Sequence, residues 1–406
     1  MRKAITLLAL VLAMPLLHAQ YTITSWSTAD GLPSDDIRDV AVGPDGTVWM
    51  ATSAGVAAFN GVAFTVHNTI THPGLPSNDL YAIGVMSNGD VWVGSDFGLS
   101  RLSGADYVTY TSADGLSDNG IRSIKQSPSG DIWVATQNGA SRYDGVTFTA
   151  YGTPSIPFGG ALHVAFGGNG KVYFSGGLGG VIVNDGGTFT SITTADGLLS
   201  NRIRSIAVTN AQEKWVGTAE GISVLDANDV HIADHPNAFL LPPPDELNPI
   251  TDMLVDDAGR VWAAVYVDYL VTVGGVSIYA NGGWSQIEEA DGLAGPNVRR
   301  LAKGIDGSIW VSTSTGLSRI SNISIGMEEI GASSFTLFPS PASALVELRS
   351  TGPFAEEWLE LCDAAGRSLL RQRVAGAPST LDVSGIPNGA YSVRFGDRVQ
   401  RLVVAH

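Results

Sequence analysis

The sequence is poor in cysteine, in charge and in long apolar runs, and each shortage narrows what the protein can be. Only one of the 406 residues is a cysteine, Cys362, so no intramolecular disulfide can form. Charged residues make up 15% of the chain, and after residue 19 no apolar run is long enough to cross a membrane as a helix. The protein must therefore be held together by its core, and we expect Cys362 to be a small side chain within it.

The sequence also lacks the short motifs that mark common catalytic and metal sites. It has no GxSxG elbow, no HExxH pair, no P-loop and no Cys/His spacing typical of a metal site. Its many Asp-Gly pairs lack the dense acidic spacing of a calcium loop, and we interpret them as turns. We therefore predict no metal and no cofactor. The net charge of −16 argues against a nucleic-acid partner, because an acidic surface repels phosphates.

The N-terminus has the pattern of a signal peptide. Met1-Arg2-Lys3 is positively charged, residues 4–17 are apolar, and Ala19 is a small residue suited to cleavage. A buried helix is the alternative interpretation. We expect cleavage after Ala19 and a mature protein that is soluble outside the inner membrane.

Glycine is abundant, and an aromatic strand recurs along the chain. The 49 glycines favour short strands joined by tight turns. The strand follows a turn, as in DGTVWMAT and SGDIWVAT, and repeats every 40 to 48 residues. Its central residues are Trp49, Trp92, Trp133, Tyr173, Trp215, Trp262 and Trp310. This period suits a four-stranded blade, so we predict an all-β, seven-bladed β-propeller over residues 20–320, with these aromatic side chains packed between blades.

The ends of the repeat region predict how the ring closes. The last unit, residues 291–320, contains three expected strands but no clear fourth. The segment from Tyr21 to Ser27 has the pattern of a fourth strand, but the first three strands of its unit do not precede it. We therefore expect the N-terminal strand to complete the seventh blade and remove the open edge of the ring.

One unit carries a family resemblance. The run from Ser112 to Gly145 resembles the two-component regulator propeller repeat of Bacteroidetes-type bacteria, and the resemblance extends over residues 21–320. The fourth unit departs from it, with Tyr173 in place of Trp and GGLGG at residues 176–180. The best-known members are periplasmic sensors of hybrid histidine kinases that detect polysaccharide fragments. This chain has neither kinase nor transmembrane helix in its sequence, so signalling is not carried over.

The C-terminal part has a different composition. Residues 321–333 read as a linker, and residues 334–406 as alternating strands and turns. The order FPSPAS, DAAGR and LDVSGIPNGAYSV is similar to the type A sorting domain of the type IX secretion system. The resemblance implies a small Ig-like β-sandwich that is recognised by the secretion machinery and directs export across the outer membrane. A plain Ig-like binding module is the alternative.

A set of polar residues recurs at the start of the innermost strands, immediately after the leading apolar residue. In a propeller these positions surround one mouth of the central channel. The residues are Arg38, Tyr81, Arg122, His163, Arg204, Thr251 and Arg299. The planar fork of arginine suits carboxylates and phosphates, which favours an anionic sugar or a similar ligand. The alternative is that each arginine pairs with a loop aspartate, such as those of the DGL turns, and only fixes the loops.

Two further segments are expected on the same face. An insertion in the sixth blade, Val265 to Gly275, carries Tyr266, Asp268 and Tyr269 as candidate ligand-binding residues. The Pro-rich stretch at residues 239–245 either walls a pocket or acts as a stiff connector.

The sequence thus predicts a secreted or cell-surface binding propeller that reaches the outside through the periplasm and recognises a glycan or another extracellular ligand. A protein–protein scaffold is one alternative. An enzyme is another, because the repeats are similar to those of streptogramin lyases, which act with a histidine and an acidic group at the channel mouth. His163 is the only mouth histidine, and no convincing acidic partner is evident in the sequence.

Overall fold

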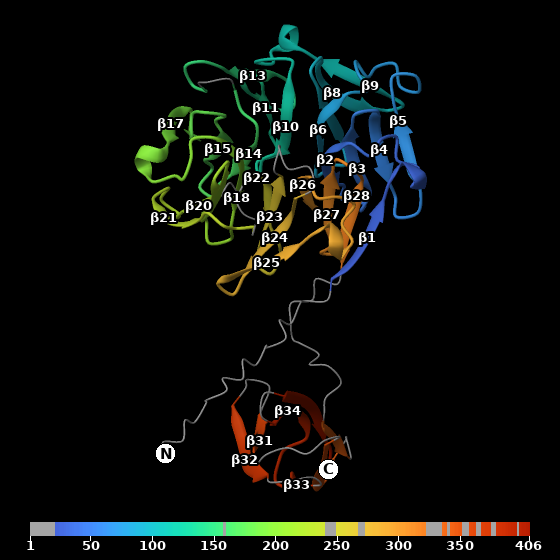
Figure 1. The fold of residues 1–406 in the computed structure, drawn as a ribbon, viewed down its shortest axis with the longest axis vertical. Helices are drawn as coiled ribbons and strands as arrows, with labels where there is room; N and C mark the ends of the chain where they lie inside the picture. The colour runs from blue at the N-terminus through green and yellow to red at the C-terminus, as the bar shows by residue number, and fades with distance from the viewer. Residues whose placement is uncertain are drawn as a thin grey trace, which may run out of the picture. The chain divides into compact units, whose positions relative to one another are not determined.

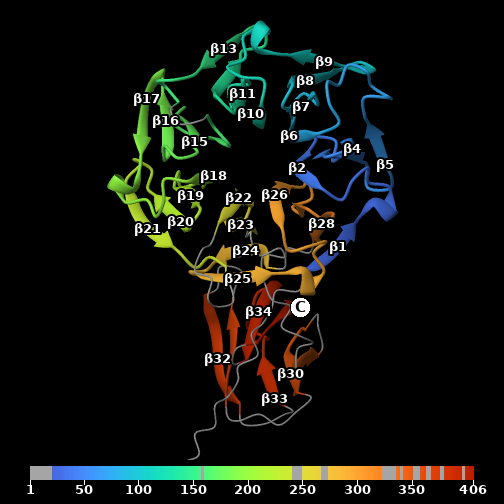
Figure 2. The same ribbon diagram turned by 45° about the horizontal axis from the view of Figure 1, so that its top comes forward.

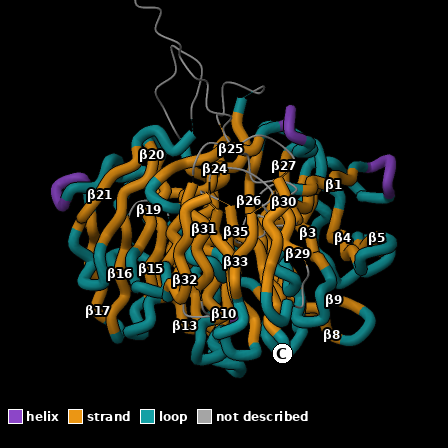
Figure 3. Tube along the Cα trace, turned by 90° about the horizontal axis from the view of Figure 1, so that it is seen from below, coloured by secondary structure: helices purple, strands orange, loops and turns teal. Residues whose placement is uncertain are grey.

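The computed structural model describes residues 21–406 apart from nine internal segments. Those segments are residues 157–159, 240–248, 267–272, 322–334, 339–341, 351–356, 363–366, 375–378 and 396–397. The predicted signal peptide lies outside the described residues. The chain divides into two compact units, residues 1–323 and 324–406, and each is treated by itself (Figure 1). In the described parts the helices are four short 3-10 turns, and none could span a membrane. Strands and loops make up nearly all of the trace (Figure 3).

The described strands of the first unit form seven four-stranded antiparallel sheets, numbered here in chain order. The first sheet contains β2 (Ile37–Val42), β3 (Val48–Thr52), β4 (Gly55–Phe59) and β5 (Phe64–His67). The second contains β6 (Leu80–Val85), β7 (Val91–Ser95), β8 (Gly98–Ser103) and β9 (Asp106–Tyr110). The third contains β10 (Ile121–Gln126), β11 (Ile132–Thr136), β12 (Gly139–Tyr143) and β13 (Phe148–Tyr151). The fourth contains β14 (Val164–Phe166), β15 (Val172–Ser175), β16 (Val181–Asp185) and β17 (Thr188–Ile192).

The last three sheets follow the same plan. The fifth contains β18 (Ile203–Val208), β19 (Lys214–Thr218), β20 (Gly221–Leu225) and β21 (His231–His235). The sixth contains β22 (Ile250–Val255), β23 (Val261–Tyr266), β24 (Gly274–Ala280) and β25 (Gly283–Ile287). The seventh contains β26 (Val298–Lys303), β27 (Ile309–Thr313), β28 (Leu317–Ser321) and the N-terminal strand β1 (Thr22–Trp26). Residues Thr22 to Trp26 pair with β28 in antiparallel register, as the sequence predicts.

The sheets are arranged as a ring. Their first strands, β2, β6, β10, β14, β18, β22 and β26, each lie beside the first strand of the next sheet, and β26 lies beside β2. Figure 2 shows these strands around the centre and the fourth strands around the outside. Since β1 belongs to the last sheet, the chain closes the ring with its own N-terminal end.

The core of the ring lies between neighbouring sheets. Six of the seven repeated aromatic side chains are at most 6% exposed, and Trp49 is half-buried. Trp133 of the third sheet, for example, packs with Val164 and Phe174 of the fourth. This agrees with the packing interpretation, because a sheet with neighbours on both faces must be apolar on both faces.

The recurring ADG sequences form tight turns before several sheets. Asp30, Asp114, Asp196 and Asp291 each end a 3-10 turn and accept a hydrogen bond from the backbone N–H three residues earlier, at 2.8–2.9 Å. The glycine that follows has φ between 105° and 114°, a conformation that only glycine adopts readily. These aspartates therefore shape turns, which is the role the sequence predicts for them.

The second unit contains two further sheets in its described residues. A three-stranded sheet is formed by β29 (Phe335–Phe338), β30 (Leu345–Ser350) and β33 (Ser379–Asp382). A four-stranded sheet is formed by β31 (Glu357–Cys362), β32 (Ser368–Val374), β34 (Gly389–Phe395) and β35 (Arg398–Val404). Leu348, Leu359 and Val393 belong to one core that both sheets line. Cys362 is buried and has a free thiol, in keeping with a core role.

Candidate functional site

Six of the candidate mouth residues lie at β-bulges. In the first sheet the pairing runs from Ile37 opposite Thr52 directly to Asp39 opposite Ala51, so Arg38 has no partner in the ladder. The same shift occurs in five other sheets. The residues that the strand register skips are Arg38, Tyr81, Arg122, Arg204, Thr251 and Arg299. A bulge bends the strand and re-aims the extra side chain, which explains why these residues share one position and one direction.

The bulged residues line a single cavity of about 670 Å³, which we call the mouth pocket. Its other lining residues come from the fourth to the seventh sheets and from the turns beside them. They are Leu162, Gly177, Leu178, Arg202, Ile203, Tyr266 and Arg300. Of the lining residues that the structure describes, six are arginines and none is acidic. The pocket is therefore a concentration of positive charge on a chain whose net charge is −16.

Two of these arginines share a carboxylate. One guanidinium nitrogen of Arg299 lies 2.7 Å from Oδ1 of Asp36, and Nε of Arg38 lies 3.3 Å from Oδ2 of the same residue. Arg38 also pairs with Asp79 at 2.9 Å. The facing carboxylates of Asp79 and Asp36 raise the pKa of Arg38 although burial opposes the rise, so its charge is permanent. The shared contacts hold the two forks in fixed orientations.

Tyr81 holds a second pair of arginines in place. The guanidinium carbons of Arg38 and Arg122 lie over its ring, 4.4 and 4.7 Å from the centroid. The Tyr81 hydroxyl donates to Asp79 at 2.9 Å, and Arg122 pairs with Asp96 at 2.7 Å. Burial and the neighbouring Asp79 raise the pKa of Tyr81, so the phenol stays protonated. The ring thus orients two guanidiniums through cation–π contacts.

Three of the mouth arginines pair with loop aspartates, as the structural alternative predicts, but not with the aspartates of the DGL turns. The DGL aspartates are engaged by their own turns, as described above. The partners are instead Asp36 and Asp79, just before the first strands, and Asp96, in the β7–β8 turn. These contacts orient Arg38, Arg122 and Arg299.

His163 is placed differently from the other mouth candidates. It is 5% exposed and does not line the mouth pocket, contrary to the sequence-based prediction. The physical reason is local: β14 begins only at Val164 and has no bulge, so no residue of the fourth sheet is re-aimed toward the opening. Burial, reinforced by Lys125 and Arg300, holds the pKa of His163 well below its usual value, and the ring is neutral.

The acidic partner of His163, which sequence reasoning missed, is Asp252. His163 Nε2 lies 3.6 Å from Asp252 Oδ1. Asp252 Oδ2 accepts a hydrogen bond from the backbone N–H of Leu301 in the next sheet, at 2.9 Å. Asp39 likewise accepts a hydrogen bond from the backbone N–H of Ile83 in the sheet after its own. Burial raises the pKa of Asp39. The available signal was an aspartate directly after a mouth residue in two units, at a position where four other units have a small or apolar side chain and the seventh has Arg300.

The segments predicted to flank the mouth are only partly described. Tyr266 ends β23 and lines the mouth pocket, as expected for its position. Asp268 and Tyr269 lie outside the described residues. Of the Pro-rich stretch, Phe239 is buried in the core between the fifth and sixth sheets, while residues 240–245 are not described. Among the described residues no group of three His, Cys, Asp or Glu side chains could hold a metal ion.

Comparisons with known proteins identify the fold class. The family described as two component regulator propeller matches residues 115–138, within the third unit of the repeat. No relative is found among curated proteins. Many solved structures share the architecture, and the chain has a β-propeller fold.

Three of these structures show the range of the resemblance. The extracellular domain of a hybrid two-component system of B. thetaiotaomicron is 16% identical, with a TM-score of 0.63 over 95% of this chain and 55% of its own. PorZ, a surface component of the type IX secretion system of Porphyromonas gingivalis, is 17% identical, with a TM-score of 0.58 over 93% of this chain and 60% of its own. A streptogramin B lyase is 14% identical, with a TM-score of 0.58 over 74% of this chain and 97% of its own. At these identities the likeness concerns the fold alone.

Proposed function

We propose that this protein is a secreted or cell-surface binding protein that recognises an anionic extracellular ligand, such as an acidic glycan, in the mouth pocket. The observation that carries the proposal is the gathering of six arginines around one opening of an acidic protein. Arginine forks bind carboxylate, sulfate or phosphate groups in two-pronged fashion, and partial burial strengthens such contacts. The cavity of about 670 Å³ lies within the usual range of ligand sites.

The architecture supports this role. We propose that the seven sheets are the blades of a closed propeller whose channel opens at the mouth pocket. The bulges recur in six sheets, so the ring of side chains is built into the repeat rather than contributed by one loop. A rigid closed ring holds the arginines in place before the ligand arrives, which lowers the entropic cost of binding.

Export is the second part of the proposal. We propose that residues 1–19 are a signal peptide and that residues 334–406 form an Ig-like sandwich read by the type IX secretion machinery. The order of the tail motifs supports this, as does the two-layered core of the second unit. If the tail is the export signal, deletion of residues 334–406 leaves the protein in the periplasm. Undiminished export of the truncated protein would contradict this role.

Replacement of Arg122 and Arg204 together by Ala tests the mouth pocket. A lost contact between arginine and an ionised ligand group costs about 1.5–3 kcal/mol, so we expect affinity for acid-bearing glycans to fall roughly tenfold or more. Binding is measured on a panel of acidic and neutral glycans, and thermal unfolding on the same samples.

The matched control is the double variant Arg101→Ala and Arg142→Ala. These arginines are also paired with aspartates, Asp90 at 2.7 Å and Asp131 at 3.0 Å, but neither lines the mouth pocket. The control should keep its ligand affinity. Unchanged binding by the mouth variant, together with a large loss of thermal stability, would assign the mouth arginines to structural ion pairs.

A protein scaffold is the second candidate, favoured by exposed apolar side chains near the pocket. Leu178 lines it and is 63% exposed, and Phe97, next to Asp96, is 62% exposed. Under this candidate the variant Leu178→Ser weakens capture of an acidic protein partner, whereas glycan arrays give no signal. The enzyme alternative gains no support from His163, because that ring is buried and absent from the pocket lining.

A further inference from the structure

The fourth sheet lacks an ion pair that the second and third sheets share. In the second sheet Asp90, two residues before Trp92, pairs with Arg101 at 2.7 Å, and the guanidinium lies over the Trp92 ring. In the third sheet Asp131 and Arg142 occupy the same positions and pair at 3.0 Å. Each arginine stands directly opposite the repeated Trp in the strand ladder. The pair covers the surface between the second and third strands.

In the fourth sheet the same two positions hold Lys171 and Val183. Val183 stands opposite Tyr173. The second, third and seventh sheets place an arginine opposite the Trp, and the first, fifth and sixth sheets an apolar residue. The valine is too short to reach across the surface, and Lys171 replaces the acidic partner. Lys171 pairs instead with Asp229 of the fifth sheet, at 2.8 Å. The space that the arginine would cover is left open.

Asp229 is engaged from three sides. Besides Lys171 it accepts from the ammonium of Lys214 at 2.6 Å and from the Tyr173 hydroxyl at 2.9 Å. Lys214 is 2% exposed and occupies a position where the other units have Val or Ile. The three donors hold the pKa of Asp229 below its usual value in spite of its burial. Tyr173, Lys214 and Asp229 are thus departures from the repeat that meet at one point.

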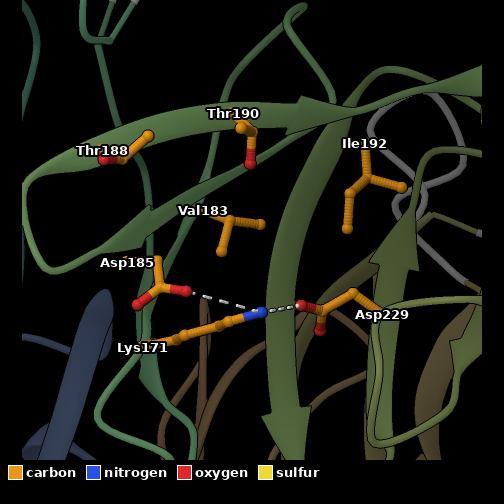
Figure 4. Close-up of a pocket in the computed structure, with 7 residues that line it drawn as sticks. All are labelled: Lys171, Val183, Asp185, Thr188, Thr190, Ile192 and Asp229. Atoms are coloured by element: carbon orange, nitrogen blue, oxygen red, sulfur yellow. Dashed lines mark hydrogen bonds and ion pairs between the residues drawn. The ribbon is translucent and has the colours of Figure 1, made fainter.

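Asp229 and Lys171 line a second cavity, of about 410 Å³, which we call the side pocket. Its lining residues come from β16 and β17, from the turn just before β15 and from the β20–β21 turn. They are Lys171, Val183, Asp185, Thr188, Thr190, Ile192 and Asp229. Figure 4 shows the Lys171 ammonium between the two carboxylates, with Thr190, Ile192 and Val183 around the same space.

The charges of the side pocket cancel. Lys171 and Lys214 face Asp185 and Asp229, so neither an anion nor a cation gains a net attraction. The pocket still offers unused hydrogen-bonding capacity. Asp185 is 66% exposed and only 4.0 Å from Lys171, and the exposed Thr190 can donate or accept. Val183 and Ile192 add an apolar wall. The pocket thus combines hydrogen-bond donors, hydrogen-bond acceptors and an apolar wall, and it has no net charge. This combination suits a neutral polyhydroxylated ring.

We propose that the side pocket binds a neutral sugar residue, independently of the mouth pocket. The apolar wall faces the C–H side of the ring, while Asp185, Thr190 and Lys171 bond its hydroxyls. A ligand of this size is expected to bind with a Kd of roughly millimolar order.

The test uses the full-length protein and five defined sugars. The neutral probes are D-glucose, D-galactose and D-mannose, and the charged counterparts are D-glucuronate and D-glucosamine. Binding is followed through the backbone amide NMR signals of residues 188–192. We expect at least one neutral hexose to give a saturable shift of these signals and to bind several-fold more tightly than either charged counterpart. The Arg122 and Arg204 double variant should bind it equally well, which separates this site from the mouth pocket.

Two variants remove the site in different ways. Thr190→Val keeps the side-chain shape but removes the hydroxyl, and we expect at least a threefold loss of affinity. Val183→Arg introduces the arginine that the second and third sheets carry at this position and should abolish binding by filling the space. The matched control is Thr149→Val on β13, since Thr149 also follows a Phe and faces the third strand in the same register. The control should leave affinity unchanged.

The proposal is overturned if none of the three neutral hexoses gives a saturable shift at residues 188–192. It is also overturned if glucuronate or glucosamine binds more tightly than the best neutral hexose, or if Thr149→Val weakens binding as much as Thr190→Val. Because Thr190 is exposed and the change is conservative, the test does not depend on whether Val183→Arg folds.

Discussion

The mouth pocket and the side pocket both arise where the repeat is modified, but the modifications differ in kind. The mouth pocket is a modification that six sheets share: a bulge turns one residue of each first strand toward the opening. The side pocket occurs at one place in the ring, where Lys171 and Val183 of the fourth sheet stand at the positions of the Asp–Arg pair of the second and third sheets and Asp229 comes from the fifth. A shared modification produces a ring of like charges. A modification at a single place produces an asymmetric pocket in which positive and negative charges cancel.

The two pockets also differ in how deeply their ion pairs are buried. At the mouth, the side chains of Asp79 and Asp96 are 48% and 44% exposed. At the side pocket, Asp229 is 12% and Lys214 is 2% exposed. Exposed pairs add little to stability because water screens them, whereas a buried charge that loses its partner is costly. The mouth arginines can therefore exchange their carboxylate partners for a ligand. The side pocket instead depends on the buried ion pair of Asp229 and Lys214, which must stay intact.

The largest expected effect is loss of stability on removing the charge of Asp229. In Asp229→Asn the buried Lys214 ammonium loses its carboxylate, which we expect to cost about 3–5 kcal/mol of unfolding free energy. Asparagine tolerates the positive φ of 69° at this position, so the backbone is not at issue. Chemical denaturation measures the change.

The matched control at the mouth is Asp96→Asn, with an expected loss of about 1 kcal/mol or less because the Arg122–Asp96 pair is half-exposed. Equal losses in the two variants would contradict the difference in burial on which the comparison rests.

The second effect is a dependence of folding stability on pH that comes from His163 and not from the side pocket. Because the folded-state pKa of His163 is well below its ordinary value, the unfolded chain takes up this proton first as pH falls. Stability is full above about pH 6.5 and declines below it, by at most about 1.4 kcal/mol per pH unit for this group. Asp229 has a lowered pKa, so its contribution stays constant over the same range and is lost only under more acidic conditions.

Denaturation of the wild type and of His163→Gln between pH 7.5 and 5.5 isolates this contribution. The difference cancels His67 and His235, whose lowered pKa values act in the same direction, and Asp39, which acts in the opposite one. Parallel stability curves for the two proteins would refute the assignment to His163.

The third effect is a difference in how salt changes ligand affinity at the two pockets. Binding of an acidic glycan at the mouth should weaken several-fold between about 0.05 and 0.5 M NaCl, because the Debye length shrinks below the dimensions of the pocket. Binding of a neutral hexose at the side pocket should be unchanged within about 1.5-fold. Titration of both ligands at both salt concentrations tests this, and a salt-independent mouth would remove the electrostatic basis of its proposed selectivity.

The smallest effect concerns Tyr81. Tyr81→Phe removes the hydrogen bond to Asp79 but keeps the ring under Arg38 and Arg122, so we expect a loss of about 0.5–1 kcal/mol in stability. Acidic-ligand affinity should fall less than in Tyr81→Leu, which removes the ring as well. If the two variants lose affinity equally, the cation–π contacts do not orient the arginines.

Much of the fold could be predicted from the sequence because its signals are local and repeated. Trp133 and its counterparts mark the second strand of each sheet, and the pairing of residues 22–26 with β28 follows from counting strands. The candidate mouth residues share one position in the repeat, and six of the seven line one cavity. His163 does not, because the fourth sheet lacks the bulge, and a bulge cannot be read from residue types alone.

The side pocket could not be predicted in the same way. Val183 and Lys214 look like ordinary variation when each unit is considered separately. Their meaning depends on Asp229, which lies 58 residues after Lys171 in the chain and reaches it only across the boundary between two sheets. The Asp252 partner of His163 was missed for the same reason.

The sequence by itself determined the repeat, the strands within each unit and the residues at each repeat position, because period-2 patterning and turn residues act over a few neighbours. Only the tertiary structure decided which charges meet. Ring closure brings together side chains from distant units, and burial between sheets decides which pairs are screened by water and which are not. That division explains why the arginines of the mouth were visible in the sequence, while their true partners and the neutral niche beside the fourth sheet were not.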